Sequence, residues 1–151
     1  MDVNKVNKIN MLVLTSKYYE HIQDSMINKQ WVINNSSTSA KKKLRTKLDK
    51  INLPALAIFY SSDKKSYTAL CLITRRIDDS EIIQNWSNDN EGDFGYGVEI
   101  KFITDASKLI HKDKMKKITH NEYILKVGDM FTFQPQELEE NEFNTIVANL
   151  L

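Results

Sequence analysis

The sequence contains few of the residues from which the commonest catalytic and metal sites are built. Its single cysteine, Cys71, allows no internal disulfide and no cysteine cluster around a metal. The three histidines, His21, His111 and His120, are far apart and belong to no catalytic or metal-binding motif. We therefore predict a protein that is not an enzyme and that needs no metal or cofactor.

Long hydrophobic runs are absent as well. The longest, residues 11–14 and 55–60, are much shorter than the ~20 apolar residues that a membrane-spanning helix needs. Residues 1–5 lack the apolar core of a signal peptide. With 151 residues, near the commonest domain size, the chain is expected to form one domain over residues 1–151, as a monomer that does not bind membranes. We expect it inside the cell, in the cytoplasm rather than the nucleus.

Glycine is also scarce, and three of the four glycines fall in one short segment, Gly92-Asp93-Phe94-Gly95-Tyr96-Gly97. A phosphate-binding loop needs a Lys-Ser/Thr pair after its glycines, and this segment has none. The aspartate inside the segment would repel a phosphate. The glycine cluster therefore does not predict a phosphate loop.

The net charge of +1 hides a strong segregation of charge along the chain. Residues 1–50 contain ten Lys or Arg and four Asp or Glu, whereas residues 134–151 contain four Glu and no basic residue. Two groups of basic residues stand out: Lys41, Lys42, Lys43, Arg45 and Lys47, and then Lys112, Lys114, Lys116 and Lys117. Either group can bind phosphates or form a solvated face, and the sequence leaves both interpretations open.

The first half of the chain predicts a strand, two helices and then a hairpin of two strands. Residues 10–15 are typical of a buried strand, and Tyr19, Ile22 and Met26 have helical spacing, with Ser16 as the expected N-cap. After a polar loop at residues 34–39, a second helix is expected up to Ile51 and ended by Pro54. Residues 55–60 and 67–74 predict an antiparallel hairpin.

The second half predicts shorter elements. We expect a short helix at 79–86, a mobile loop at 87–97, and strands at 98–104, 122–127 and 130–133. An amphipathic C-terminal helix is indicated by Leu138, Phe143, Ile146, Val147 and Leu150. Together these elements predict a sheet of five or six strands.

The two tryptophans are the most informative residues for function. Trp31 and Trp86 each stand where an expected element gives way to a polar segment, among hydrogen-bonding neighbours such as Gln30 and Asn85. A tryptophan in such a place either packs at the edge of the core or presents its ring to a ligand. The sequence pattern alone does not choose between these two interpretations.

Several stretches of the sequence together resemble the YTH domain, a family that reads N6-methyladenosine in RNA. The stretches are Met11-Leu12-Val13-Leu14-Thr15-Ser16, then Trp31 at the end of the first helix, then Lys42-Lys43-Leu44. The likeness continues through Ile58-Phe59-Tyr60-Ser61 and from Gly95 to Ile103, so it covers nearly the whole chain. The resemblance implies an α/β (α+β) fold with a curved mixed sheet or open barrel of five or six strands, surrounded by helices.

The resemblance also implies a site. Its aromatic cage for the modified base would consist of Trp31, Trp86 and Phe94. Hydrogen bonds to the base would come from His21, where relatives have Asn or Asp, from the backbone carbonyl of Val32, and from Lys17. The residues implied in contact with the RNA backbone are Ser16, Lys41, Lys42, Lys43, Lys126 and Asp129. The implied partner is single-stranded RNA containing N6-methyladenosine.

A cage of this kind selects the methylated base by two effects. Burying one methyl group contributes about 0.8 kcal/mol, which gives only about a fourfold preference. The unmethylated amino group carries an additional N–H that a dry aromatic box cannot satisfy, so the cage also rejects the unmodified base.

Two alternatives remain open at the level of sequence. Because His21 changes the edge that faces the base, the chain can be a reader of another modified base, in RNA or DNA, as in the broader PUA and EVE group. The departures from the family pattern at His21, Thr15 and Gly128 also suit a protein-interaction domain that has lost its pocket.

Overall fold

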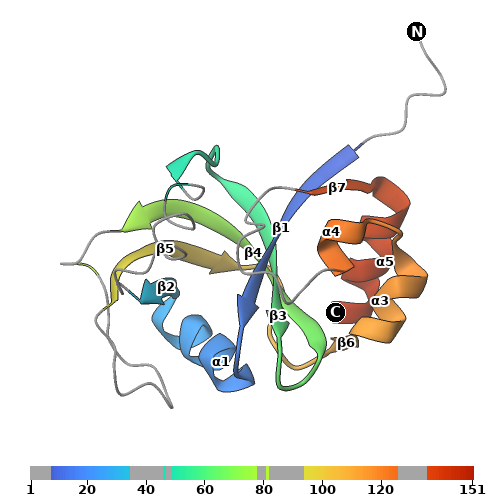
Figure 1. The fold of residues 1–151 in the computed structure, drawn as a ribbon, viewed down its shortest axis with the longest axis horizontal. Helices are drawn as coiled ribbons and strands as arrows, with labels where there is room; N and C mark the ends of the chain where they lie inside the picture. The colour runs from blue at the N-terminus through green and yellow to red at the C-terminus, as the bar shows by residue number, and fades with distance from the viewer. Residues whose placement is uncertain (1–7, 35–45, 47–48, 78–80, 82–93, 126–135) are drawn as a thin grey trace, which may run out of the picture.

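The computed structural model describes residues 8–34, 46, 49–77, 81, 94–125 and 136–151. In chain order the elements are β1 (Lys8–Ser16), α1 (Tyr19–Asn28), β2 (Gln30–Asn34), β3 (Ala55–Ser61), β4 (Ser66–Ile77), β5 (Phe94–Phe102), β6 (Ile110–His111), α3 (Lys112–Ile118), α4 (Glu122–Leu125), β7 (Gln136–Glu139) and α5 (Glu140–Leu150) (Figure 1). Within these ranges, no helix is long and apolar enough to cross a membrane.

The strands form one open, mixed sheet. In the described part of the chain the sheet has seven strands in the order β2-β5-β4-β3-β1-β7, and β6 pairs with β4 beside this path. The pair β1–β3 is parallel, with Leu12 opposite Ala57, and the other pairs are antiparallel. The predicted fold class is confirmed, with a sheet somewhat larger than the five or six strands expected.

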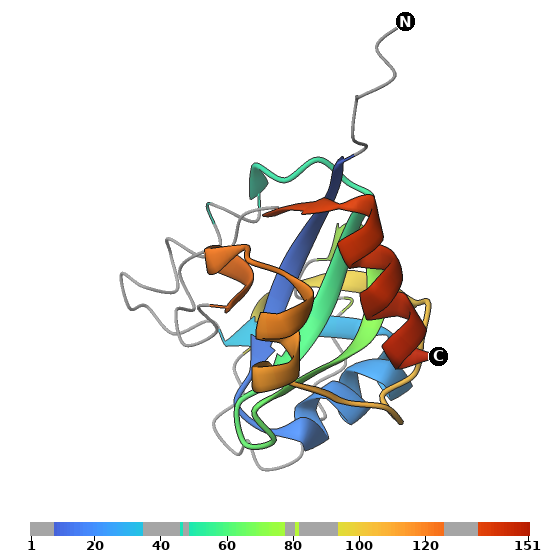
Figure 2. The ribbon, with the colours of Figure 1, turned by 90° about the vertical axis from the view of Figure 1, so that its right-hand side faces the viewer.

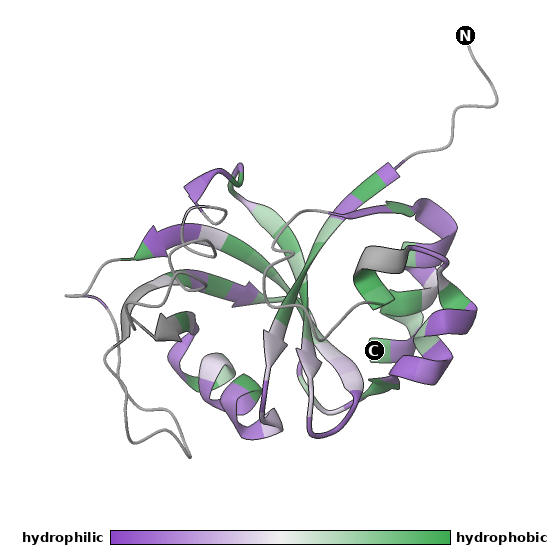
Figure 3. Cartoon of the chain, in the orientation of Figure 1, coloured by the Kyte–Doolittle hydropathy of each residue, from purple (hydrophilic) through white to green (hydrophobic). Residues whose placement is uncertain are grey.

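Side chains that alternate along the strands form a hydrophobic core on each face of the sheet. On β1, Leu12 and Leu14 belong to one core and Met11 to the other, as a period of two dictates. α1 covers the first core, whereas α3, α4 and α5 cover the second (Figures 1 and 2). Hydrophobic residues are concentrated along the central strands (Figure 3).

The structure confirms the elements with the clearest periodicity. The strand predicted at 10–15, the first helix, the hairpin, the strand beginning at residue 98 and the C-terminal helix are all present, within β1, α1, β3–β4, β5 and α5. Thr46 and Asp49 are helical, as expected for the second helix. Lys50 and Ile51 are not helical, so the prediction that this helix reaches Ile51 is wrong. The other residues of that helix, most of the helix predicted at 79–86 and the strand predicted at 130–133 lie outside the described residues.

Some predictions near the first helix are wrong. Ser16 is the last residue of β1 rather than a helix cap, and Tyr18 occupies the N-cap position. α1 ends at Asn28, because Lys29 adopts a left-handed conformation with φ of 57°. Trp31 therefore lies inside β2 and does not close the helix.

Predictions in the second half also needed correction. Residues 94–97, expected in a mobile loop, are the first residues of β5. The strand predicted at 122–127 is wrong over residues 122–125, which form α4, because the Asn121 side chain accepts a hydrogen bond from the N–H of Ile124 at 3.1 Å. Leu138 lies in β7, not in the C-terminal helix.

Candidate functional site

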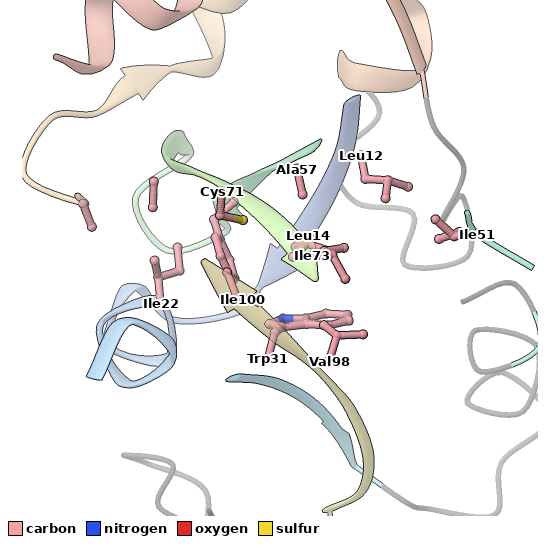
Figure 4. Packing of buried hydrophobic residues seen from close by; sticks show 13 residues of the cluster. Leu12, Leu14, Ile22, Trp31, Ile51, Ala57, Cys71, Ile73, Val98 and Ile100 are labelled. Carbon is pink, nitrogen blue, oxygen red and sulfur yellow. The ribbon is translucent and has the colours of Figure 1, made fainter. Parts of the chain in front are cut away.

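Trp31 lies in β2 at one edge of the sheet, with its indole turned into the first core. It pairs with Val98 of β5, and only 7% of its surface is exposed. Figure 4 shows the indole under the side chains of Leu14 and Ile73 and beside Val98. Of the two interpretations that the sequence left open for this residue, the structure supports packing of the ring at the edge of the core.

Gly97 allows β2 to lie unusually close to β5 next to Trp31. It is opposite Val32, and a Cβ atom added to it would lie 2.7 Å from the Trp31 carbonyl oxygen and 2.8 Å from Cγ1 of Val32. Both distances are shorter than van der Waals contact, so a side chain here would push the two strands apart. The signal in the sequence is a glycine within an alternating strand, which often marks a close backbone approach.

The carbonyl group of Val32 points to the outer edge of the sheet. The Lys29 carbonyl accepts from the N–H of Ile100 at 2.9 Å. Because hydrogen-bonded and non-hydrogen-bonded pairs alternate in antiparallel strands, Trp31 and Val98 form a hydrogen-bonded pair, and Val32 and Gly97 do not. No described strand pairs with the outer edge of β2, where Val32 therefore presents its N–H and C=O.

The segment that follows β2 returns close to Trp31 at residues 49–51, where hydrogen bonds hold it. The guanidinium group of Arg76 donates to the carbonyl oxygens of Asp49 and Ile51, at 2.9 and 2.6 Å. Arg76 is opposite Val98, which in turn is opposite Trp31. The side chain of Ile51 joins the core cluster that contains Trp31 (Figure 4).

The segment that follows β4 is anchored at the same place. Glu81 forms a salt bridge of 2.6 Å with Arg75, which also pairs with Glu99 at 2.9 Å. The backbone oxygen of Glu81 accepts a hydrogen bond of 2.7 Å from the Gln30 side chain, next to Trp31. This segment carries Trp86, which itself lies outside the described residues.

The remaining cage and backbone contacts are only partly located. Phe94 begins β5, opposite Asn34, and its side chain is not described. Four lysines and one aspartate predicted to contact the RNA backbone lie outside the described residues: Lys41, Lys42, Lys43, Lys126 and Asp129. The cage and these contacts therefore stay predictions.

Lys17 and His21, both predicted to contact the base, each contact the ring of Tyr18. The sequence did not single out Tyr18. Nζ of Lys17 lies 5.3 Å from the centre of the Tyr18 ring, within the range of a cation–π contact. The His21 ring meets the Tyr18 ring edge to face, at 5.3 Å between centres and 81° between planes. Their neighbour Ser16 is buried, so it is not an exposed contact for RNA by its side chain.

The turn between β3 and β4 supports this cluster. The N–H groups of Ser62 and Asp63 donate to the carbonyl oxygens of Ser16 and Lys17, at 2.9 and 3.2 Å. The Asp63 carboxylate accepts from the N–H of Tyr19 at 3.0 Å, at the start of α1. Since Tyr18 makes no capping hydrogen bond with its side chain, α1 is capped by a residue from a distant turn.

The Asp63 carboxylate is held in its charged form. Partial desolvation acts to raise its pKa, but hydrogen bonds from the Ser61 hydroxyl and from the N–H groups of Tyr19 and Lys64 outweigh that effect. The pKa of Asp63 therefore lies below its ordinary value.

Replacing Asp63 with alanine is expected to destabilise the fold by about 0.5–2 kcal/mol, because α1 loses its cap. The asparagine variant keeps an acceptor for Tyr19 and is expected to lose less. The carboxylate stabilises the fold fully above its unfolded pKa of about 3.9 and less as pH falls through its lower folded pKa. Urea unfolding of wild type and Asp63→Asn should therefore show a stability gap at pH 7 that shrinks below about pH 4; a gap that does not change with pH would contradict this account.

A groove of about 750 Å³ lies next to the residues that precede Trp31 in the sequence. It is lined by Met26, Asn28, Lys29, Gln30, Thr74, Glu99, Ile100, Lys101 and Phe102. None of the described side chains predicted to contact the base lines it. Among the described residues, no three His, Cys, Asp or Glu side chains are grouped so as to hold a metal ion.

Comparisons with known proteins were informative only at the level of structure. No family model and no curated protein matches the sequence. The fold is similar to the YTH domain of Zygosaccharomyces rouxii MRB1, solved with N6-methyladenosine RNA, with a TM-score of 0.56, 15% identity and coverage of 92% of this chain and 84% of that one. The chain has a YTH-like fold.

Two further structures are similar to this chain, one of them a YTH domain. The Toxoplasma CPSF4-YTH domain in its apo form has a TM-score of 0.62 and 11% identity, over 100% of this chain and 93% of that one. A hypothetical protein from Leishmania major has a TM-score of 0.56 and 16% identity, over 93% of each chain. At such identities the YTH-like fold is shared while most side chains differ.

Proposed function

We propose that this chain is a non-catalytic RNA-binding domain that reads N6-methyladenosine in single-stranded RNA. The observation that carries the proposal is the arrangement at β2: a core-fixed indole at Trp31 followed by a backbone carbonyl at Val32 on the outer edge of the sheet. An aromatic ring beside an outward carbonyl suits a methylated amino group, whose methyl prefers an apolar wall and whose remaining N–H needs one acceptor.

The connectivity around β2 supports a role for Trp86 in the same site. Trp86 follows Glu81 by five residues, and Glu81 is hydrogen-bonded to Gln30, the neighbour of Trp31. Five residues reach at most about 16–18 Å. That length allows the proposed position of Trp86 beside Trp31, and Phe94 begins β5 opposite Asn34, at the other end of β2.

The fold of the relatives agrees with this proposal. The domain of Zygosaccharomyces rouxii MRB1 with the same fold was solved in complex with N6-methyladenosine RNA. In this chain, the proposed contact with the ring of the base comes from His21 on α1, whose own ring lies against Tyr18.

The test is a fluorescence-anisotropy titration of a short RNA with one central N6-methyladenosine and of its unmethylated twin. Wild type should bind the methylated RNA more tightly by at least the fourfold that burial of a methyl group gives, at about 0.8 kcal/mol. Trp86→Ala should lose this preference. Ile27→Ala is the matched control, because Ile27 is a large apolar side chain that is 76% exposed on α1.

Other outcomes contradict the proposal in different ways. Equal binding of the two RNAs would leave a general RNA-binding domain without a reader function. Displacement by a different methylated base in RNA or DNA, but not by N6-methyladenosine, would favour the alternative specificity. Absence of binding would favour a protein-interaction domain.

A further inference from the structure

Four lysines lie on segments that backbone hydrogen bonds join near Tyr18: the end of β1, the β3–β4 turn and the start of α3. Figures 1 and 2 show these segments together at one end of the sheet. The Lys112 N–H donates to the Lys65 carbonyl at 2.9 Å, and Ser66 pairs with His111. The lysines brought together by these backbone contacts are Lys17, Lys64, Lys65 and Lys112.

Three acidic residues lie on or next to the same segments, and one of them, Asp63, is engaged in the turn. The Asp63 carboxylate accepts hydrogen bonds from the Ser61 hydroxyl and the Tyr19 N–H, so it serves the turn. Asp113 lies 3.5 Å from Nδ1 of His111. Glu20 is the other exposed carboxylate near Tyr18 in the sequence. The lysines therefore outnumber the acids, and three of them, Lys17, Lys64 and Lys65, are exposed.

The Tyr18 ring is held in place beside these charges. Hydrogen bonds from the β3–β4 turn fix the backbone on both sides of Tyr18, at Lys17 and Tyr19. The ring itself is partly exposed and contacts His21 at its edge. An aromatic ring fixed among cations is the arrangement by which proteins bind single-stranded nucleic acid: bases stack on the ring and phosphates meet the cations.

We propose that Tyr18, with Lys64, Lys65 and Lys112, forms a second subsite that binds an unmodified nucleotide flanking the methylated one. Tyr18 stacks on the flanking base, and the three lysines contact the adjacent phosphates. Lys17 and His21, which are proposed to contact the methylated base, both lie against the Tyr18 ring. The inference rests on the proposed RNA-binding function and adds a stacking residue to it.

The stacking part is tested with Tyr18→Ala and its matched control Tyr18→Phe, which keeps the ring. Loss of one stacked base should weaken RNA binding roughly 5- to 150-fold. The loss should be equal for methylated and unmethylated RNA, so that the methyl preference of each variant stays that of wild type. Tyr18→Phe should bind within about twofold of wild type, because stacking needs the ring and not the hydroxyl.

An abasic nucleotide in the RNA identifies the flanking position directly. Placed on the side that Tyr18 binds, it should weaken binding to wild type as much as Tyr18→Ala does, and should cost Tyr18→Ala nothing further, since the two changes remove one interaction. Additive losses at both flanking positions would overturn the stacking assignment, as would Tyr18→Ala binding within twofold of wild type.

The phosphate part is tested by salt dependence. Each phosphate that a lysine neutralises on a single strand adds roughly 0.7 to the slope of log affinity against log salt. The double variant Lys64→Gln with Lys65→Gln should therefore lower this slope by about 1.4. The control Lys8→Gln with Lys101→Gln removes the same charge from other exposed positions and should leave the slope unchanged. Equal slopes for both double variants would overturn the phosphate assignment.

The two proposals fail in distinguishable ways. If wild type prefers methylated RNA but the Tyr18 and lysine variants bind normally, only the subsite is wrong. If wild type binds RNA without methyl preference and these variants weaken it, the subsite stands and the reader function is wrong. Absence of any RNA binding by wild type would overturn both.

Discussion

Replacing Trp31 with alanine is expected to destabilise the fold by about 3–5 kcal/mol, the usual cost of deleting a large buried aromatic side chain. The indole is 7% exposed and packs with Leu14, Ile73 and Val98. Its loss would leave a cavity between β2 and the centre of the sheet. Urea unfolding, monitored by circular dichroism at 25 °C, measures the effect.

Trp31→Phe separates the two roles of this residue. Phenylalanine keeps an aromatic wall but fills less of the core, so we expect a smaller loss of stability and a reduced, not abolished, preference for methylated RNA. A Trp31→Ala variant that unfolds within about 1 kcal/mol of wild type would show that the indole is not part of the core.

Replacing Gly97 with alanine is expected to destabilise the fold by about 1–3 kcal/mol and to weaken binding of methylated RNA more than tenfold. The new Cβ would lie 2.7 Å from the Trp31 carbonyl oxygen, so β2 must move away from β5. That movement displaces both the ring of Trp31 and the carbonyl of Val32. Urea unfolding, amide NMR shifts along β2 and the anisotropy titration report the three effects.

A second change shows whether the close approach of the strands is the cause. Val32→Ala removes Cγ1, which lies 2.8 Å from the added Cβ, but leaves the Trp31 carbonyl in place. Added to Gly97→Ala, it should therefore restore only part of the lost stability. If Gly97→Ala instead stabilises the chain by about 0.4–1 kcal/mol, as alanine does at unconstrained positions, the strands are not in contact there.

The sequence predicted those elements whose own residues show a period. β1, β3 and β4 alternate or are apolar throughout, and α5 has a clear apolar stripe. β7 was missed because its residues, Gln136 to Glu139, are mostly polar, and it exists only because β1 offers a partner edge. The end of α1 was misplaced because Lys29, not a glycine or asparagine, adopts the left-handed conformation.

In the candidate site too, local sequence indicated some residues, whereas others gain their role only from long-range pairing. Trp31 stood out by its chemistry, but its neighbour across the sheet, Gly97, gains its role only from the pairing of β2 with β5. Tyr18 was overlooked because nothing local distinguishes it from Tyr19. The distinction between them comes from Asp63, whose turn orders this region from far along the chain.

The pairing of β1 with β7 has a consequence for how this protein is made. Lys8 is opposite Glu139, so two strands that lie far apart in the sequence are neighbours in the sheet. During synthesis on the ribosome, the edge of β1 that pairs with β7 stays unpaired until residues 136–139 have emerged. Contacts of such long sequence separation slow folding, and an unpaired strand edge invites association with other chains. The nascent protein is therefore expected to be most prone to association with other chains before β7 has emerged.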